Sequence, residues 1–226
     1  MIATIVNTAA VVAGGLIGLL AKKGLPERIS KGIMAAIGLM LICSGVKGYF
    51  DGQSSIIAVL SLALGTGLGE LLRLEERLNH LGERIGARVF RSGGSRIGEG
   101  LVTATLLFCV GAMAVLGSLQ SGLAGDHTTL YTKSLMDFIS AILLASTYGI
   151  GVVLSAIGVL LYQGAITLLS GLLAPVMTEA AIAELSAVGS IVLVGLGLNL
   201  TGVAKLRVMN MVPSIFIAIV LAQIMH

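Results

Sequence analysis

Residues 134–174 form a run of 41 amino acids with a single charged side chain, that of Asp137. Two membrane-spanning helices of about 20 residues each would fill this run without slack. Near its middle, the sequence Thr-Tyr-Gly-Ile-Gly at 147–151 is the least apolar point and predicts a tight turn. We therefore expect the run to cross a membrane twice. The alternative is a single crossing with a re-entrant hairpin, which occurs where protein buries the irregular backbone.

The rest of the chain has the same apolar character. Of its 226 residues, 56% are hydrophobic and only 11% are charged, whereas about 25% are charged in a typical soluble domain. Six further apolar runs predict additional spans at 2–21, 32–50, 55–72, 100–119, 179–200 and 208–225. Residues 121–133, which include Lys133, predict a polar loop, and Pro213 predicts a kink inside the last span. The predicted fold class is therefore all-α: a single polytopic membrane bundle, residues 1–226, with about eight transmembrane helices.

Basic residues test this topology, because cytoplasmic loops of membrane proteins are enriched in lysine and arginine. If 134–174 crosses twice, twelve of the fourteen basic residues lie on one side, and only Lys47 and Lys133 lie on the other. A single crossing would move Lys205 and Arg207 away from the basic side. We expect that side to be cytoplasmic, which places the N-terminus outside. Because the basic residues flank spans, they do not indicate nucleic acid as a partner.

Short sequences recur in the same order near the two ends of the chain. Ile-Gly-Leu-Leu at 17–20 is similar to Ile-Gly-Val-Leu at 157–160, and Ala-Ile-Gly at 36–38 is similar to Ala-Val-Gly at 187–189. Residues 1–72 would then form one three-span repeat and 152–226 an inverted copy, with two central spans in 100–147 between them. Inverted repeats are the ground plan of many secondary transporters. Glycine-rich apolar helices also resemble each other by composition alone, and that alternative stays open.

Several short motifs carry a family resemblance. In chain order they are Asn7-Thr8-Ala9 with Gly14-Gly15, Leu25-Pro26-Glu27-Arg28-Ile29, Lys133-Ser134 with Asp137, and Ala187-Val188-Gly189. In these motifs the chain resembles the bacterial inner-membrane family catalogued as domain of unknown function 554, the YqgA-like proteins, over nearly its whole length. The resemblance implies a small multipass protein of the bacterial inner (plasma) membrane. It implies neither a substrate nor catalytic residues.

Asp137 is the acid that falls clearly within a predicted span. A carboxylate inside a membrane is a candidate cation or proton site, because its burial is costly. In a second interpretation, Ser134 and Asp137 have the spacing of a capping box at a helix start, and Lys133 pairs with Asp137. The position of Asp137 at the beginning of the apolar run favours the capping role.

The other candidates for a solute or ion path are amides and glycines. Asn7, Asn199 and Asn210 lie near the ends of spans, where an amide can coordinate a solute, although bonding between helices is its commoner role. Gly38 and Gly189 occupy matching places in the second and seventh spans. Glycine interruptions in corresponding segments of two halves point to a transport site. Close helix crossing is the alternative interpretation of each glycine.

Residues 70–91 differ from the apolar runs, because leucines recur there at steps of three and four with arginines on the other faces. This pattern predicts an amphipathic helix along the cytoplasmic lipid surface. Arg73, Arg77, Arg84 and Arg88 would contact anionic lipid or a protein partner.

Two further expectations concern glutamate and glycine positions. Glu184 near the start of the seventh span is expected to be solvated. The glycine pairs Gly14/Gly18 and Gly65/Gly69, each with a spacing of four residues, are expected to form the contact of a homo-oligomer, most simply a dimer.

These patterns predict a small secondary transporter or ion-conducting protein for a small solute or ion. We expect no enzymatic activity, because the spans contain no catalytic motif. We also expect no cofactor and no metal site, because His80, His127 and His226 are not spaced as ligands. The alternative function is a non-transporting membrane scaffold or regulatory subunit that acts through residues 70–91.

Overall fold

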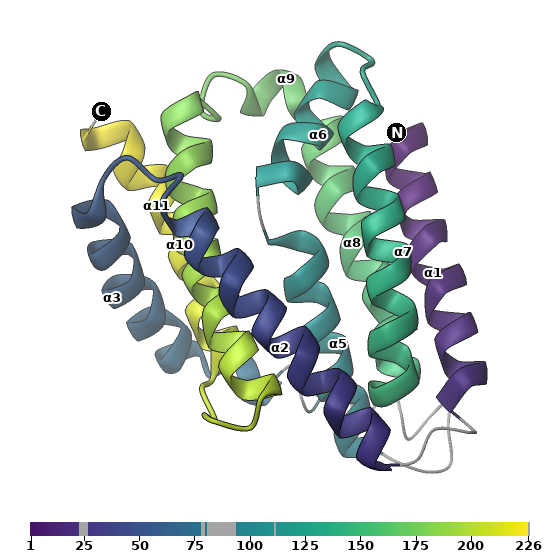
Figure 1. Cartoon of the computed structure of the whole chain (residues 1–226). Helices are drawn as coiled ribbons and strands as arrows, with labels where there is room; N and C mark the ends of the chain where they lie inside the picture. Colours follow the sequence, from purple (N-terminus) through teal and green to yellow (C-terminus); the bar gives the residue numbers. More distant parts are fainter. Residues whose placement is uncertain (23–26, 78–79, 81–93, 111, 226) are drawn as a thin grey trace.

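The computed structural model describes residues 1–22, 27–77, 80, 94–110 and 112–225, and every regular element among them is helical (Figure 1). The elements are α1 (Ile2–Lys22), α2 (Glu27–Tyr49), α3 (Ser55–Leu72), α5 (Gly94–Cys109), α6 (Ala112–Leu123), α7 (Thr128–Tyr148), α8 (Ile150–Leu168), α9 (Ser170–Leu173), α10 (Glu179–Leu200), the 3₁₀ turn η1 (Val208–Met211) and α11 (Pro213–Met225). The predicted all-α bundle is confirmed.

Within the described residues, six helices are long and apolar enough to cross a membrane: Ile2–Ala21, Lys31–Tyr49, Ser55–Leu72, Ile150–Leu168, Glu179–Leu200 and Val208–Met225. The bent pair α5 and α6 makes seven if it is counted as one span. Helix α7 is not among them; it carries both Lys133 and Asp137. The chain is thus a multispanning membrane protein, and the total of eight spans stays a prediction.

The run 134–174 folds as two antiparallel helices rather than one. Helix α1 runs parallel to α7, because Gly14 and Gly18 contact Phe138 and Ile142 in turn. Helix α8 runs the opposite way, because its residue Val153 lies against Gly15 and its later residues lie against the start of α1. Gly149 separates α7 from α8 with φ 79°, a value that favours glycine. The predicted turn at 147–151 is confirmed at this residue.

The first three helices each contact a partner from the end of the chain. Helix α2 packs antiparallel on α10, where a Cβ on Gly38 would lie only 2.8 Å from the carbonyl oxygen of Gly197. Helix α3 packs antiparallel on α11 and η1, with Gly65 against Ser214 and Gly69 against Asn210. Helix α1 lies against α8 as well as α7. Both chain termini lie at the same end of the bundle (Figure 1).

The apolar core is built where the central helices meet. Phe108 of α5, Leu144 of α7, Val152 of α8 and Val11 of α1 are fully buried in one cluster. Because apolar surface gains nothing by moving from lipid into protein, close packing rather than the hydrophobic effect holds such helices together. The glycine contacts between helices supply this close packing.

Three predicted boundaries were wrong. The span predicted at 100–119 is two helices, α5 and α6, bent by 59°. Helix α7 begins at Thr128, so the polar residues before Ser134 are helical rather than a loop. The kink expected inside the last span at Pro213 is a helix start instead: η1 precedes it, and α11 begins at the proline, where its missing N–H costs nothing.

The predicted amphipathic helix at 70–91 begins differently from the prediction. Helix α3 continues to Leu72, and Arg73 then adopts a left-handed conformation with φ 50°. A new helical turn occupies 74–77. Arg84 and Arg88 lie outside the described residues.

Candidate functional site

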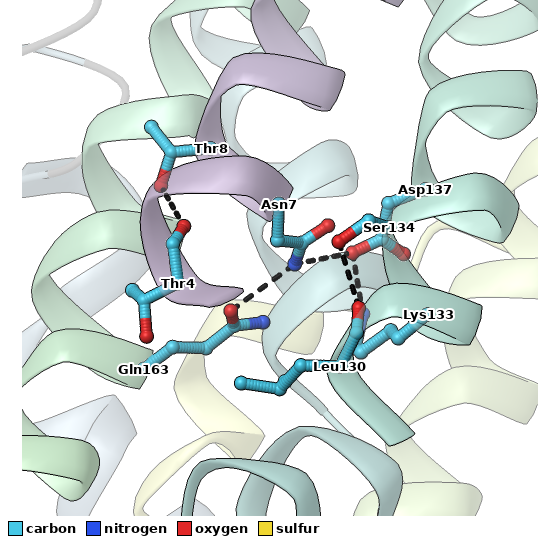
Figure 2. A network of polar contacts seen from close by, with 8 residues as sticks. All are labelled: Thr4, Asn7, Thr8, Leu130, Lys133, Ser134, Asp137 and Gln163. Carbon is cyan, nitrogen blue, oxygen red and sulfur yellow. Dashed lines mark hydrogen bonds and ion pairs between the residues drawn. The ribbon is translucent and has the colours of Figure 1, made fainter. Parts of the chain in front are cut away.

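Polar side chains from three helices meet near the N-terminal end of α1 (Figure 2). Asn7 comes from α1, Asp137 from α7 and Gln163 from α8, and the side chains of Asn7 and Gln163 are 0% exposed. Asp137 lies nine residues after the start of α7, about 13 Å along the helix at 1.5 Å per residue. The cluster therefore lies inside the bundle and not at its surface.

The amide of Asn7 joins the other two side chains. Its Nδ2 donates to Asp137 Oδ2 at 3.0 Å and to Gln163 Oε1 at 3.1 Å. An ionised carboxylate only accepts hydrogen bonds, so the NH₂ group of Asn7 must face Asp137. The orientations of the Asn7 and Gln163 amides are thereby fixed, and the two hydrogen bonds connect α1, α7 and α8.

Lys133 completes the cluster with a buried ion pair. Its Nζ lies 2.6 Å from Asp137 Oδ2, and both side chains are 8% exposed. The two residues are four apart on α7, so they share one helix face. Ion pairs inside a membrane bundle are costly to bury and are found mainly where function requires them.

Two polar atoms of the cluster have no hydrogen-bond partner among the described residues. They are Asn7 Oδ1, an acceptor, and Gln163 Nε2, a donor. Leaving a buried donor or acceptor unpaired costs about 1–3 kcal/mol each. The cluster thus offers one acceptor and one donor next to an ion pair, an arrangement suited to a polar ligand, water or a transferred proton.

Hydroxyl groups extend the polar region along the same helices. Thr4 and Thr167 approach each other at 3.3 Å between their Oγ1 atoms. The Thr8 hydroxyl donates to the Thr4 carbonyl oxygen at 2.8 Å (Figure 2). Ser134 donates to the Leu130 carbonyl oxygen at 2.7 Å. Ser134 lies inside α7 and caps nothing, so the capping-box interpretation was wrong because the helix begins a turn and a half earlier.

Glycine packing brings α1 and α7 close enough for these bonds. A Cβ on Gly14 or Gly18 would collide with the α7 backbone at Phe138 and Ile142. Gly14 and Gly18 are therefore buried in a contact between two helices of the same chain. Gly65 and Gly69 likewise pack on Ser214 and Asn210. Neither pair is free to form the predicted contact between two copies, so that part of the oligomer prediction was wrong.

The remaining candidate residues lie away from the cluster. Gly38 packs on α10, and Gly189 packs on Val110, next to the bend between α5 and α6. Asn199 bonds the Leu206 backbone through both amide atoms, each at 2.7 Å, and closes the loop after α10. Of the six predicted path residues, only Asp137 and Asn7 are brought together.

Asn210 also has a structural role, at the end of the bundle opposite the termini. Its Oδ1 accepts the Glu75 N–H at 2.9 Å, and Glu75 Oε2 accepts the Met209 N–H at 3.3 Å. Burial raises the pKa of Glu75 above its ordinary value, against the opposing effect of the Met209 N–H. These bonds fasten the turn after α3 to η1.

A cavity of about 500 Å³ opens at this same end. Its polar lining includes Glu75, Glu99, Tyr148, Asn199 and Lys205. The hydroxyl of Tyr148 donates to Glu99 Oε1 at 3.4 Å. The size is that of pockets for small molecules.

Two buried polar residues differ from the sequence-based predictions: Gln163 was not predicted as part of a site, and Glu184 was predicted to be solvated. Gln163 is an amide within an apolar run, which is itself a signal, because uncompensated polar groups are rare in spans. Glu184 is fully buried rather than solvated, and its Oε1 accepts the N–H groups of Gln53 and Ser54 at 2.8 and 2.7 Å. A carboxylate at this place stabilises the N-terminus of α3.

Of the four arginines predicted to contact lipid or a partner, the structure describes two, Arg73 and Arg77. Arg73 and Arg77 are exposed, and Arg73 lies 3.9 Å from Glu76. Over the described ranges, no group of three histidine, cysteine, aspartate or glutamate side chains could hold a metal ion.

The chain is similar to two curated proteins over nearly their full lengths. A sequence profile described as "Protein of unknown function (DUF554)" matches residues 2–223. The "Uncharacterized membrane protein YdfK" of Bacillus subtilis is 34% identical over 230 residues, which cover 100% of this chain and 97% of the relative. The "Uncharacterized protein YqgA" of Escherichia coli is 29% identical over 227 residues, covering 98% and 96%. No solved structure matches the chain.

Proposed function

We propose, from the premise that this chain belongs to the DUF554 family of membrane proteins, that it is a small secondary transporter or ion-conducting protein without enzymatic activity. The observation that carries the proposal is the buried Lys133–Asp137 pair bonded to Asn7. We assign the polar cluster to the path of a cation or of a small solute coupled to one.

Stability alone does not account for the ion pair. Replacing a buried pair by well-packed apolar residues is often neutral or stabilising by about 1–4 kcal/mol. A membrane bundle built for stability would therefore carry apolar side chains at Lys133 and Asp137. Charged groups inside membrane bundles instead mark ion pathways and proton relays.

The contacts between the chain ends support an inverted repeat. A two-fold axis in the membrane plane reverses the direction of each helix, so a helix that touches its own copy must be antiparallel to it. The proposed copies are α1 with α8, α2 with α10 and α3 with α11, and each pair is in antiparallel contact. This architecture is shared by many secondary transporters.

The proposed topology follows from the same arrangement. The protein would lie in the bacterial inner membrane with eight spans and with both termini outside, since both termini lie at one end of the bundle (Figure 1). Arg28, Arg73 and Lys205 follow or precede spans at the opposite end, which is the side that the positive-inside rule assigns to the cytoplasm. We propose a homodimer, held by contacts other than the glycine pairs already used within the chain.

Flux through reconstituted protein tests the proposal. Proteoliposomes with a pH-sensitive dye inside, and parallel samples with radioactive Na⁺ or Rb⁺, would be compared for the wild type, Asp137→Asn and Asp51→Asn. Asp51 is exposed between α2 and α3 and is the matched control. We expect Asp137→Asn to lower the initial rate by about tenfold or more, because a hydrogen bond to a charged group contributes about 1.5–3 kcal/mol, and Asp51→Asn to leave it unchanged.

Absence of proton, Na⁺ and Rb⁺ flux in the wild type would contradict the proposal, as would an Asp137→Asn variant that is as fast as the wild type. Equal elution of the variants from a sizing column in detergent would show that they are folded. In the first case the scaffold or regulatory alternative would be favoured. Its exposed Arg73 and Arg77 would then be tested for binding to anionic vesicles.

A further inference from the structure

Glu99 occupies a position in α5 that is comparable to the position of Asp137 in α7. Each acid precedes a helix break by twelve positions: Gly149 follows Asp137 and ends α7, and Gly111 follows Glu99 in the interval between α5 and α6. A basic residue also precedes each acid by about one helical turn, Lys133 in one case and Arg96 in the other. Asp137 and Glu99 are 38 positions apart, which sets the register for comparing α5 with α7.

Packing of the neighbouring helices gives the same register. Gly18 of α1 lies against Ile142 and Ala145 of α7, and Gly158 of α8, the residue proposed to match Gly18, lies against Thr105 of α5. Shifted by 38 positions, Thr105 falls between Ile142 and Ala145. The contact between α8 and α5 therefore has the same register as the contact between α1 and α7.

The hydrogen-bond partners of the two acids lie one position apart in this comparison. Asp137 bonds to Asn7 of α1, and Glu99 bonds to Tyr148. In the register that matches Gly18 to Gly158, Tyr148 corresponds to Thr8, the residue after Asn7. Two independent features, spacing along the chain and contacts in space, therefore pair Glu99 with Asp137 at opposite ends of one helix layer.

The surroundings of the two acids differ. Asp137 is buried against Lys133, whereas Glu99 is exposed and lines the cavity of about 500 Å³ at the end opposite the termini. The other charged groups on that cavity are Glu75, from the turn after α3, and Lys205, from the loop after α10. Among the residues that the structure describes, two carboxylates and one amine line the cavity, so this described lining carries an excess of negative charge.

We propose that Glu99 is a second cation-accepting carboxylate, the counterpart of Asp137, and that the cavity beside it admits a proton or a small monovalent cation. The inference rests on the proposed function. A cation reaches Glu99 from the cavity. At the opposite end of the bundle, the ion pair with Lys133 keeps Asp137 buried. A titratable neighbour of Asp137 on another helix is Cys109 of α5, which interacts electrostatically with both Lys133 and Asp137.

The first test measures access and requires no transport. In a chain with both cysteines, Cys43 and Cys109, replaced by alanine, a cysteine is placed by Glu99→Cys and, as the reference, by Glu76→Cys, an exposed position after α3. A cationic, membrane-impermeant thiol reagent is added to inside-out and right-side-out vesicles. We expect both cysteines to react from the same side, with rates within about tenfold. Labelling of Glu99→Cys from the other side, or from neither, would overturn the cavity as an entry route.

The second test measures flux. Proton, Na⁺ and Rb⁺ uptake would be compared for Glu99→Gln, Glu99→Asp and the control Glu76→Gln. We expect Glu99→Gln to slow the ion that the wild type carries by about tenfold or more, while Glu99→Asp, which keeps the carboxylate, retains most of the rate. The ion that is slowed identifies the source of the positive charge.

The outcomes separate the two proposals. If Asp137→Asn abolishes flux and Glu99→Gln does not, the transport function stands and the role of Glu99 is wrong. If wild-type protein carries none of the three ions, both are wrong. If Glu99→Gln elutes as an aggregate, Glu99→Cys from the first test replaces it, because this variant also lacks the carboxylate. A flux lowered about tenfold in Glu99→Cys that elutes like the wild type supports the role, and a wild-type rate refutes it.

Discussion

The Lys133–Asp137 pair makes a quantitative prediction about stability. At 2.6 Å, the attraction is roughly 6 kcal/mol for an effective dielectric constant of about 20, and desolvation of each ion costs several kcal/mol in return. The two contributions nearly cancel, so the pair as a whole adds little. Removing only the amine is different, because it leaves the Asp137 carboxylate buried without its counter-charge. We expect Lys133→Met to lower the free energy of unfolding by about 3–5 kcal/mol.

The double variant Lys133→Met with Asp137→Leu separates the charge effect from packing. It should recover at least about half of the lost stability, although Asn7 then loses one acceptor, at about 1 kcal/mol. Unfolding in mixed micelles with increasing SDS would give the free energies at neutral pH. Lys47→Met, an exposed lysine on α2, is the matched control and should lie within about 0.5 kcal/mol of the wild type.

The reasoning is refuted by either of two results. A loss below about 1 kcal/mol for Lys133→Met would mean that Asp137 does not depend on this amine. A double variant less stable than Lys133→Met would mean that the charges stabilise the fold and are not retained for another purpose.

Four further predictions concern other parts of the chain. Gly69→Ala places a methyl group against the η1 backbone and should lower the free energy of unfolding by about 1–3 kcal/mol. Gly67→Ala is the control on the same helix, because no atom lies within 4 Å of the added Cβ. It should be neutral or stabilising by up to about 1 kcal/mol. Glu184→Ala removes the acceptor of two part-buried N–H groups before α3 and should cost about 1–3 kcal/mol of unfolding free energy. Glu184→Gln, which keeps an acceptor, should cost less in the same titration. The Thr128 N–H lowers the pKa of Asp126, so the carboxylate stabilises the fold fully above its unfolded pKa of about 3.9. The difference in melting temperature between wild type and Asp126→Asn should shrink as the pH falls below about 4 and should be lost once the pH passes the lowered folded pKa. Reporter fusions at the two termini should be active on the same face of the membrane, and activity on opposite faces would require an odd number of spans.

The helices were predictable from the sequence because their signal is local. An apolar run of about 20 residues bounded by polar residues suffices to place a span, and α1, α3 and α10 follow this rule within two residues. The turn at Gly149 was predictable for the same reason. The start of α7 was not, because Lys133 was assigned to a loop, and only the contact with Asp137 one turn later explains how its charge is accommodated inside a helix.

Which residues contact Asp137 was harder to predict than Asp137 itself. Asp137 and Asn7 are identifiable as polar residues in apolar segments, but the register of α1 on α7, fixed by Gly14 and Gly18, decides that they touch. Asn199 and Asn210 are the same residue type and also lie near span ends, but their amides bond to backbone groups of neighbouring segments. No local pattern distinguishes an amide that bonds a loop from an amide that bonds a buried carboxylate.

The energetic balance of the ion pair also bears on mechanism. Under the proposed function, neutralising Asp137 by a proton removes the attraction of roughly 6 kcal/mol and leaves the Lys133 ammonium buried without its partner. That state is costly unless Lys133 gives up its own proton or its ammonium group moves toward water. Lys133 lies five residues from the start of α7, close enough to the helix end for its side chain to extend toward the membrane surface. Under the proposed function, a proton bound to Asp137 would release the Lys133 side chain toward this helix end, and the pair would have two arrangements that the transported cation could bias.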